Sequence, residues 1–329
     1  MQRAGAEFHR FTEPGDALRA MPGMSLSVVP VGTTSYEASL ATIRLGDAAL
    51  NLCHSSPFMA FATTDADAVT LQFPVEAAGS LVLNGVTCRP GTIGVCGEGA
   101  ELLLASRGAG THAAIVLPSR LAETLLGPRA GAMLWQPGRL ALLQAAPEAW
   151  ERARQVVGAA GKTVASVPQV FGTEQPRQAL REALLQATRD LVSGEGEQEV
   201  RAPRSTKARR RIVMAADAYL RENKDRPIYT EDLCDALAVS ASSLADAFRA
   251  MFDISPHRFL KLRRLSMIRA ALLSHADAVP LVKSVALSHG FWHLGQFAAD
   301  YRATFGESPS ETLARAGRRV VPDDADAAA

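Results

Sequence analysis

The chain has 329 residues, of which 47% are apolar and 21% are charged, and its net charge is +1. This composition is typical of a folded chain with two ordinary domains and excludes wholesale disorder. No apolar run reaches the roughly 18 residues that a membrane-spanning helix needs, and the first residues contain no apolar signal segment. We therefore expect a cytoplasmic protein. The four cysteines show neither a CxxC pattern nor metal-ligand spacing, so we expect no disulfide framework and no bound metal.

The charge is distributed unevenly along the chain. Residues 1–200 carry 15 Lys and Arg against 19 Asp and Glu, a balance of −4. Residues 201–319 carry 20 against 12, a balance of +8, and residues 320–329 hold three Asp and no basic residue. A basic C-terminal third indicates a polyanion-binding module, although a solvated surface rich in Lys and Arg would give the same count.

Residues 24–118 consist of short apolar segments that are separated by turn signals about every 8–12 residues. Many of the segments alternate, and NG at 84–85 and GEG at 97–99 are typical of hairpin turns. This pattern predicts an antiparallel barrel or sandwich over residues 1–118. It contains no βαβ spacing and no glycine-rich phosphate loop, which argues against a nucleotide-binding domain.

Residues 119–195 change to a helical period, with Gly127 as a helix stop and an apolar stripe on the last helix. The stripe consists of Leu180, Leu184, Leu185 and Leu191. These helices could pack on a second copy and form a dimer, or pack on their own barrel. Residues 196–207 are polar and read as a linker, and residues 317–329 have the composition of a disordered tail.

The C-terminal third contains an internal repeat with an offset of 53 residues. Leu244, Phe248 and Phe252 reappear as Phe297, Tyr301 and Phe305, and Ser255-Pro256 reappears as Ser308-Pro309. Each copy has the pattern of a helix, a short turn and a second helix, over residues 230–252 and 282–305. The spacing predicts a helical domain over residues 208–316 with two helix-turn-helix units.

Local signals define the ends of these helices. Thr230 and Ser240 are the expected N-caps of the first unit, and Gly306 is the expected C-cap of the second. Cys234 lies where two helices must approach closely, so we expect a structural role for it. Between the copies, residues 255–275 contain no helix breaker and predict a rod of roughly 30 Å.

A rod of this length can hold two recognition helices near one DNA turn apart, in successive major grooves. This geometry, rather than a charge count, makes double-stranded DNA the expected partner. The basic residues of the rod would partly neutralise phosphates and partly be solvated; they are Arg258, Lys261, Arg263, Arg264 and Arg269.

The segment GFWHLGQFAADYRATFGESPSE at 290–311 closely resembles the signature of the AraC/XylS family of bacterial transcription regulators. The resemblance covers about residues 209–316, and the first copy matches too. It implies a DNA-binding domain of seven helices, preceded in many members by a cupin-like barrel that binds an effector and by helices that dimerise. The expected fold class is therefore α+β, with an N-terminal antiparallel cupin-like β-barrel, trailing helices and a C-terminal all-α domain.

The outer faces of the two units provide the candidate DNA contacts. We expect base contacts from Ser242, Ser243, Asp246, His293 and Gln296. We expect phosphate contacts from Thr230, Ser240, Arg249, Lys283 and Arg302. Asp246 departs from the family, which usually has an arginine there, so the first unit is expected to dock more weakly. His293 could instead cap its helix, Asp246 could pair with Arg249, and Trp292 is expected to pack or contact the backbone.

The upstream domain carries no catalytic motif. Metal-binding cupins need closely spaced histidines and a glutamate, whereas His54 and His112 are far apart in the sequence, and no G-x-S-x-G elbow occurs. We therefore expect no enzyme activity and no cofactor. The polar candidates for the barrel interior are Arg44, Asn51, His54, Gln72 and Cys96, and the effector-binding residues cannot be chosen among them.

The sequence thus predicts a dimeric, nucleoid-associated transcription regulator that binds promoter DNA and contacts RNA polymerase, with a small effector acting on the barrel. One alternative is a regulator whose barrel binds no ligand and only dimerises or binds a protein. A second alternative is a metal-dependent cupin enzyme fused to a DNA-binding domain.

Overall fold

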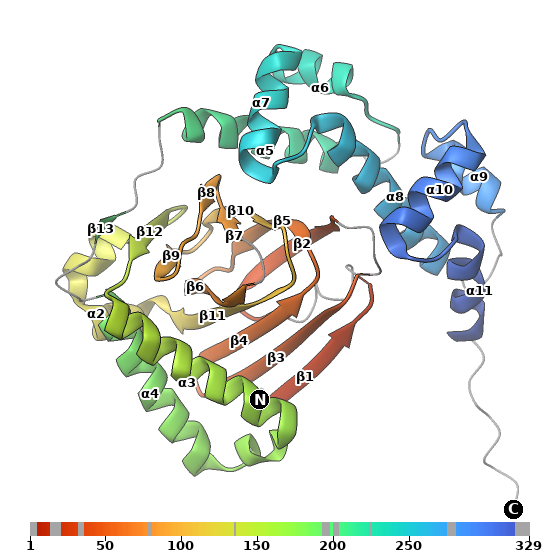
Figure 1. Ribbon diagram of the computed structural model, residues 1–329. Coiled ribbons are helices and arrows are strands. Elements are labelled where there is room, and N and C mark those ends of the chain that lie inside the picture. Colours follow the sequence, from red (N-terminus) through yellow and green to blue (C-terminus); the bar gives the residue numbers. More distant parts are fainter. Residues whose placement is uncertain are drawn as a thin grey trace, which may run out of the picture. The chain divides into compact units, whose positions relative to one another are not determined.

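The computed structural model describes residues 5–13, 21–31, 36–77, 81–134, 136–192, 198–199, 204–223, 226–274 and 281–319. The chain divides into two compact units, residues 1–28 with 36–210 and residues 29–35 with 211–329. Nearly all strands belong to the first unit, whereas the second is helical (Figure 1).

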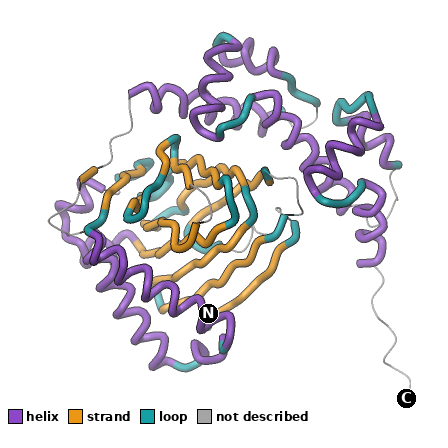
Figure 2. The backbone as a smooth tube through the Cα atoms, viewed as in Figure 1, coloured by secondary structure: helices purple, strands orange, loops and turns teal. Residues whose placement is uncertain are grey.

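Two antiparallel sheets form the core of the first unit (Figure 2). The larger sheet has the order β1 (Ala6–Phe11), β3 (Ala38–Leu45), β4 (Ala48–Ser55), β11 (Gly110–Pro118), β6 (Ala68–Ala77), β9 (Thr92–Cys96), β12 (Leu140–Gln144), β13 (Gln198–Glu199). The smaller sheet has the order β2 (Met24–Pro30), β5 (Phe58–Thr64), β10 (Glu101–Ser106), β7 (Leu81–Leu83), β8 (Val86–Thr87). The described strands pair within each sheet and not around one closed cylinder, so the predicted barrel is an open antiparallel sandwich.

The larger sheet is buried on both faces. On β6, Leu71 and Phe73 belong to a core shared with the covering helices, while Gln72 between them is buried on the opposite face. The opposite face packs on the smaller sheet through a second cluster that includes Phe58 and Leu102. Side chains alternate between the faces of a strand, so burial on both sides explains strands that are apolar almost throughout.

The helices of the first unit are α2 (Ser119–Leu134), α3 (Pro147–Ser166), the short 3-10 helix η1 (Pro168–Gly172) and α4 (Glu174–Val192). Gly127 adopts φ 79° and ψ 162° and breaks α2, as the sequence predicts, but the chain becomes helical again after it. Val157 of α3 and Leu184 and Leu191 of α4 share one core with the larger sheet. Of the two alternatives for this stripe, the structure shows packing on the chain's own sheet (Figure 1).

Strand β12 differs from the helical interpretation of residues 119–195. Leu140–Gln144 pair with β9 on one side, and Gln144 and Leu143 pair with Gln198 and Glu199 on the other. Ala141 and Leu143 enter the helix-side core and Leu142 the opposite one, so the segment is buried with period 2. The helix starts only at Pro147, because proline favours the first helical position.

From residue 211 onward the second unit consists of helices joined by short turns, and the first of these helices begins seven residues earlier. They are α5 (Arg204–Glu222), α6 (Thr230–Leu237), α7 (Ala241–Phe252), α8 (Pro256–Ser274), α9 (Val282–Ser288), α10 (Leu294–Phe305) and α11 (Pro309–Arg319). Helix α5 starts four residues before the expected domain boundary at 208, and α11 extends into the expected tail. The rest of that tail, residues 320–329, lies outside the described residues. The predicted fold class, α+β with an all-α C-terminal domain, is confirmed.

None of the helices in the described ranges is long and apolar enough to cross a membrane.

Candidate nucleic-acid interface

The internal repeat is present in the structure as two helix-turn-helix units, α6 with α7 and α9 with α10 (Figure 1). Phe252 stacks on Phe259 of α8 at a ring-centroid distance of 5.9 Å, and the ring of Phe248 packs on Phe259 at a tilt, at 5.0 Å. The equivalent residues of the second unit, Tyr301 and Phe305, are buried in a core with Leu265 of α8. Both units therefore pack on the same connecting helix through the residues that the repeat aligns.

The N-termini of the second helices, which approach DNA in such units, are built differently. Ser240 caps α7, since its Oγ accepts a hydrogen bond from the Ser243 amide at 3.1 Å. His293 has the equivalent N-cap position of α10, but its side chain makes no cap hydrogen bond and is exposed. The structure thus leaves His293 outside the capping role that the sequence also allows.

The expected cap at Thr230 is wrong. Thr230 is the first helical residue of α6, and Tyr229 is the N-cap. The Tyr229 amide donates to Oδ2 of Asp232 at 2.8 Å, so the carboxylate at the third helical position satisfies the helix start. Sequence preference favours Thr as a cap, but here the extended segment before α6 places Tyr229 there.

The candidate base-contact residues are exposed at the starts of the two second helices. Ser242, Ser243 and Asp246 lie on the exposed face of α7, and His293 and Gln296 lie on that of α10. The hydroxyl of Ser243 already uses part of its hydrogen-bonding capacity within the protein, because its Oγ accepts a hydrogen bond from the Ser240 hydroxyl at 2.9 Å.

Gln296 is held by a short polar chain that sequence reasoning missed. Its Nε2 donates to Oδ1 of Asp300 at 3.2 Å, and the same oxygen accepts from Nζ of Lys261 at 3.0 Å. Lys261 lies on α8, so this chain connects the candidate reader to the connecting helix. The i, i+4 spacing of Gln296 and Asp300 is the one signal in the sequence that could have indicated it.

The candidate phosphate contacts differ in how available they are. Arg249 and Lys283 are exposed, and Arg302 is exposed but lies 3.5 Å from the Glu311 carboxylate. Ser240 already serves as a cap, and Thr230 is half-buried. A further exposed group, Trp292, is 72% accessible directly before His293, and no described residue stacks on its ring.

The expectation that the arginines of α8 meet phosphates needs correction. Arg263 lies 2.8 Å from Asp217 of α5, and Arg269 lies 2.9 Å from Glu307 with a side chain only 8% exposed. The guanidinium of Arg264 lies over two aromatic rings, and burial lowers its pKa. Of the five basic residues expected on the rod, Arg258 alone is exposed. The others serve internal contacts, because α8 is covered on several sides.

Cys234 is half-buried in α6. Burial raises the pKa of its thiol, and the carboxylates of Asp235 and Glu231 raise it further, so the thiol stays protonated at neutral pH. This agrees with the structural role expected from the sequence.

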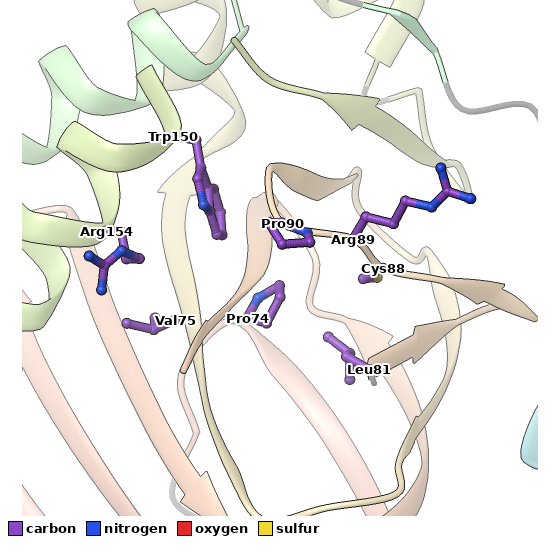
Figure 3. A pocket seen from close by; sticks show the side chains of 8 residues that line it. All are labelled: Pro74, Val75, Leu81, Cys88, Arg89, Pro90, Trp150 and Arg154. Atoms are coloured by element: carbon purple, nitrogen blue, oxygen red, sulfur yellow. The ribbon is translucent and has the colours of Figure 1, made fainter. Parts of the chain in front are cut away.

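The N-terminal compact unit, which holds the two sheets, contains a pocket of about 480 Å³ between α3 and the ends of β6 and β7 (Figure 3). Its lining residues are Pro74, Val75, Leu81, Cys88, Arg89, Pro90, Trp150 and Arg154. Trp150 projects from α3 toward the two prolines, whereas the guanidinium of Arg89 points away from them. Arg154 is already paired with Glu151 through hydrogen bonds of 2.8 and 2.9 Å. Five of the eight lining residues are apolar and one is a cysteine, and Arg154 is already paired with a carboxylate.

The two histidines that are distant in the sequence lie on neighbouring strands, since His54 pairs with Thr111 and Cys53 pairs with His112. Burial, and secondarily His54, lowers the pKa of His112 to about 4. Both ring nitrogens of His112 are covered and have no hydrogen-bond partner among the described residues. No group of three or more His, Cys, Asp and Glu in the described ranges could hold a metal ion. Of the candidates for the interior, Asn51, Gln72 and Cys96 are buried, while Arg44 is half-buried and His54 is exposed.

Three comparisons place the chain among known proteins. Residues 233–315 match the model of a helix-turn-helix domain family. The XylDLEGF operon transcriptional activator 2 of Pseudomonas putida is 38% identical over 95 residues, which are 29% of this chain and 60% of that protein. The probable thc operon regulatory protein of Rhodococcus erythropolis is 34% identical over 132 residues, 40% of this chain and 38% of that protein. The matched region therefore spans less than two thirds of either relative.

The crystal structure of the AraC-like transcriptional activator CuxR covers 79% of this chain and 90% of its own, with 12% identity and a TM-score of 0.39. The match to the helix-turn-helix model, over residues 233–315, covers most of the region where the sequence resembles the AraC/XylS signature. This match includes most of both repeats, which the structure shows as two helix-turn-helix units packed on one helix. The match over residues 233–315 thus supports the resemblance of this C-terminal region to the AraC/XylS family of regulators.

Proposed function

We propose that the protein is a sequence-specific transcription regulator that binds double-stranded promoter DNA through its two helix-turn-helix units. The observation that carries the proposal is that both exposed helix faces are mounted on one continuous helix. Helix α8 has 19 residues, so it is about 28 Å long, close to the roughly 34 Å between successive major grooves on one face of DNA. The curated relatives are operon regulators, which is consistent with this function.

We further propose unequal roles for the two units. The second unit presents His293, Gln296 and the exposed Trp292, whereas the first presents two serines and Asp246, whose negative charge is unfavourable near phosphate. Base contacts from Ser242, Ser243, Asp246, His293 and Gln296 and phosphate contacts from Thr230, Ser240, Arg249, Lys283 and Arg302 stay part of this proposal. We expect the second unit to supply most of the base discrimination.

The experiment that tests this function starts from random duplex DNA. The full chain should enrich a motif with two boxes, and footprinting should place one unit on each box. Asp246→Arg should then raise affinity for matched and scrambled DNA alike, since repulsion is exchanged for attraction. A chain that enriches no motif, or binds all duplexes equally, would contradict the proposal.

We propose that a small, mainly apolar effector binds to the N-terminal compact unit, which holds the two sheets. The pocket beside Trp150 supports this, because it has about 480 Å³ of space and apolar walls. Trp150 also offers a local readout. A compound that raises the melting temperature of the full chain should also change its tryptophan fluorescence. Trp150→Phe should remove the fluorescence response and the control Trp292→Phe should keep it. If no compound of a metabolite panel stabilises the chain, the ligand-independent alternative is favoured.

Under the same proposal, residues 1–118 bind the effector and residues 119–195 form the dimer interface. Residues 196–207 are the linker to the DNA-binding domain, residues 208–316. The inner faces of α3 and α4 are covered by their own sheet, so a homodimer would use the outer faces. Light scattering of the full chain tests the dimer. A contact with RNA polymerase, if present, should be detected by transcription in a purified system. We propose no catalytic role and a cytoplasmic location for this regulator.

A further inference from the structure

One side chain contacts both helix-turn-helix units. The guanidinium carbon of Arg264, on α8, lies 5.0 Å from the ring centre of Tyr229 and 5.1 Å from that of Phe291. Tyr229 is the N-cap of α6 in the first unit, and Phe291 lies in the turn between α9 and α10 of the second. A guanidinium between two aromatic faces is held by cation–π attraction from both sides.

The backbone of the second helix-turn-helix unit also meets side chains of the segment before α6 at this point. A Cβ atom on Gly290 would lie 2.7 Å from Oη of Tyr229 and 2.9 Å from Cβ of Pro227. Gly290 also has a φ of +78°, which side chains disfavour. The turn of the second unit therefore packs directly against the segment that leads into the first.

This contact lies where α8 changes partners. Phe259, before Arg264, packs on the aromatic residues of the first helix-turn-helix unit, while Leu265 and Ile268, after it, belong to the core of the second. Each unit is thus anchored to its own half of the helix. Without a direct bond between the units, each could tilt about α8 while the helix itself stayed intact.

We propose that Arg264, clamped between Tyr229 and Phe291, locks the two units into one rigid reader and so fixes the spacing between the two DNA boxes that the protein accepts. The inference rests on the proposed function. Arg264 is a positioning residue, since its guanidinium packs between two rings and its Nε is covered. The salt bridge between Lys261 and Asp300 is a second tie across the same junction.

The test uses the duplex that the full wild-type chain selects from random DNA, and the same duplex with one base pair inserted between the boxes. The insertion moves the second box by about 3.4 Å and roughly a tenth of a turn. A rigid reader should lose about tenfold or more in affinity, since one unit must release its contacts. Arg264→Met should bind the original duplex more weakly but should bring the two affinities within about threefold of each other.

Two further variants make the result specific. Arg258→Met removes the same charge from an exposed position on α8, so it should weaken both duplexes equally and leave their ratio unchanged. Tyr229→Ala removes the clamp from the first unit, at a side chain that is 39% exposed, and should reproduce the Arg264→Met ratio. If circular dichroism shows that Arg264→Met is unfolded, the ratio of affinities measured with Tyr229→Ala tests the clamp instead.

The outcomes separate the two proposals. Wild-type ratios in both Arg264→Met and Tyr229→Ala would overturn the clamp and leave the proposed function intact. Failure of the wild-type chain to select any duplex would overturn the proposed function and the clamp with it.

Discussion

At the scale of single residues, Gln296 is the side chain on which base discrimination should depend most. Its Nε2 is held by Asp300, and an amide has a second N–H and a carbonyl oxygen for an adenine edge. Gln296→Ala should therefore cost about 1–3 kcal/mol on the best site and relax the preference at one base pair. Titration against duplexes with all four bases at each position measures both effects.

The matched control for Gln296 lies 53 residues earlier, at Ser243. Its hydroxyl is engaged with Ser240 at the start of α7, so Ser243→Ala should change the base preference less. A larger effect from Ser243→Ala than from Gln296→Ala would show that the first unit is the main reader.

Arg269 should matter for stability and not for DNA. Its buried guanidinium contacts the Glu307 carboxylate at 2.9 Å and lies 4.6 Å from the ring centre of Phe305. Arg269→Met leaves Glu307 with Arg315 as a partner, at 2.8 Å, so we expect a loss of about 2 kcal/mol, below that for a fully orphaned buried charge. Chemical denaturation followed by circular dichroism measures it.

The exposed pair of Arg302 and Glu311 provides the comparison for Arg269. Both side chains are more than half exposed, so Arg302→Met should change the free energy of unfolding by less than about 0.5 kcal/mol. Equal losses of unfolding free energy from Arg269→Met and Arg302→Met would mean that the burial of the Arg269 ion pair adds nothing to its contribution to stability.

Protonation of His112 should make the N-terminal compact unit, which holds the two sheets, less stable at acidic pH. Its pKa is lowered from 6.5 to about 4, so between these pH values the unfolded chain binds a proton that the folded chain does not. The free energy of unfolding should therefore fall by about 2–3 kcal/mol as the pH decreases from about 6.5 to 4.

The variant His112→Phe isolates this contribution from that of the carboxylates. Phenylalanine retains a ring beside Phe58 but cannot take up a proton. Melting temperatures of both chains from pH 7 to pH 4 should diverge, with the shallower decline in His112→Phe. Parallel curves would show that His112 titrates normally in the folded protein.

At the scale of elements, the two turns of the repeat differ in one instructive position. Ala238 ends α6 in the left-handed region with φ +50°, where the second unit has Gly290 with φ +78°. A left-handed alanine is strained, while glycine loses more entropy on folding. Ala238→Gly should therefore stabilise the chain, by at most about 1 kcal/mol. Denaturation curves of this variant and of the wild type provide the measurement, and a clear loss of stability would contradict the account.

The same scale shows what the sequence could and could not reveal. The repeat, the cap at Ser240 and the helix break at Gly127 were readable because they depend on neighbours in the chain. Residues 140–144 fit a helix equally well in period, and only the partner β9, more than 40 residues away in the chain, makes them a strand. The internal roles of Arg263 and Arg269 depend on Asp217 and Glu307, which meet them only after folding.

At the scale of the whole molecule, the net charge of +1 conceals how few exposed cations lie among the described residues of the two helix-turn-helix units and α8. The exposed cations on the two helix-turn-helix units and α8 are Arg249, Arg258, Lys283 and Arg302. Each phosphate contact contributes about −0.9 to the slope of log affinity against log salt, so we expect about −3 to −4 for one chain. A slope near twice that value would mean that the inward arginines of α8 turn to the phosphates on binding.

Single variants separate charge from base reading within this salt dependence. Arg302→Ala should reduce the magnitude of the slope by about 1 and weaken all sequences alike, because a phosphate contact carries no base information. Gln296→Ala should leave the slope unchanged while it lowers the affinity for the preferred site alone. The measurement is a salt titration of both variants on matched and scrambled duplexes. If Arg302→Ala altered base preference with an unchanged slope, its guanidinium would contact a base edge, and the division of the second unit into reading and anchoring residues would be wrong.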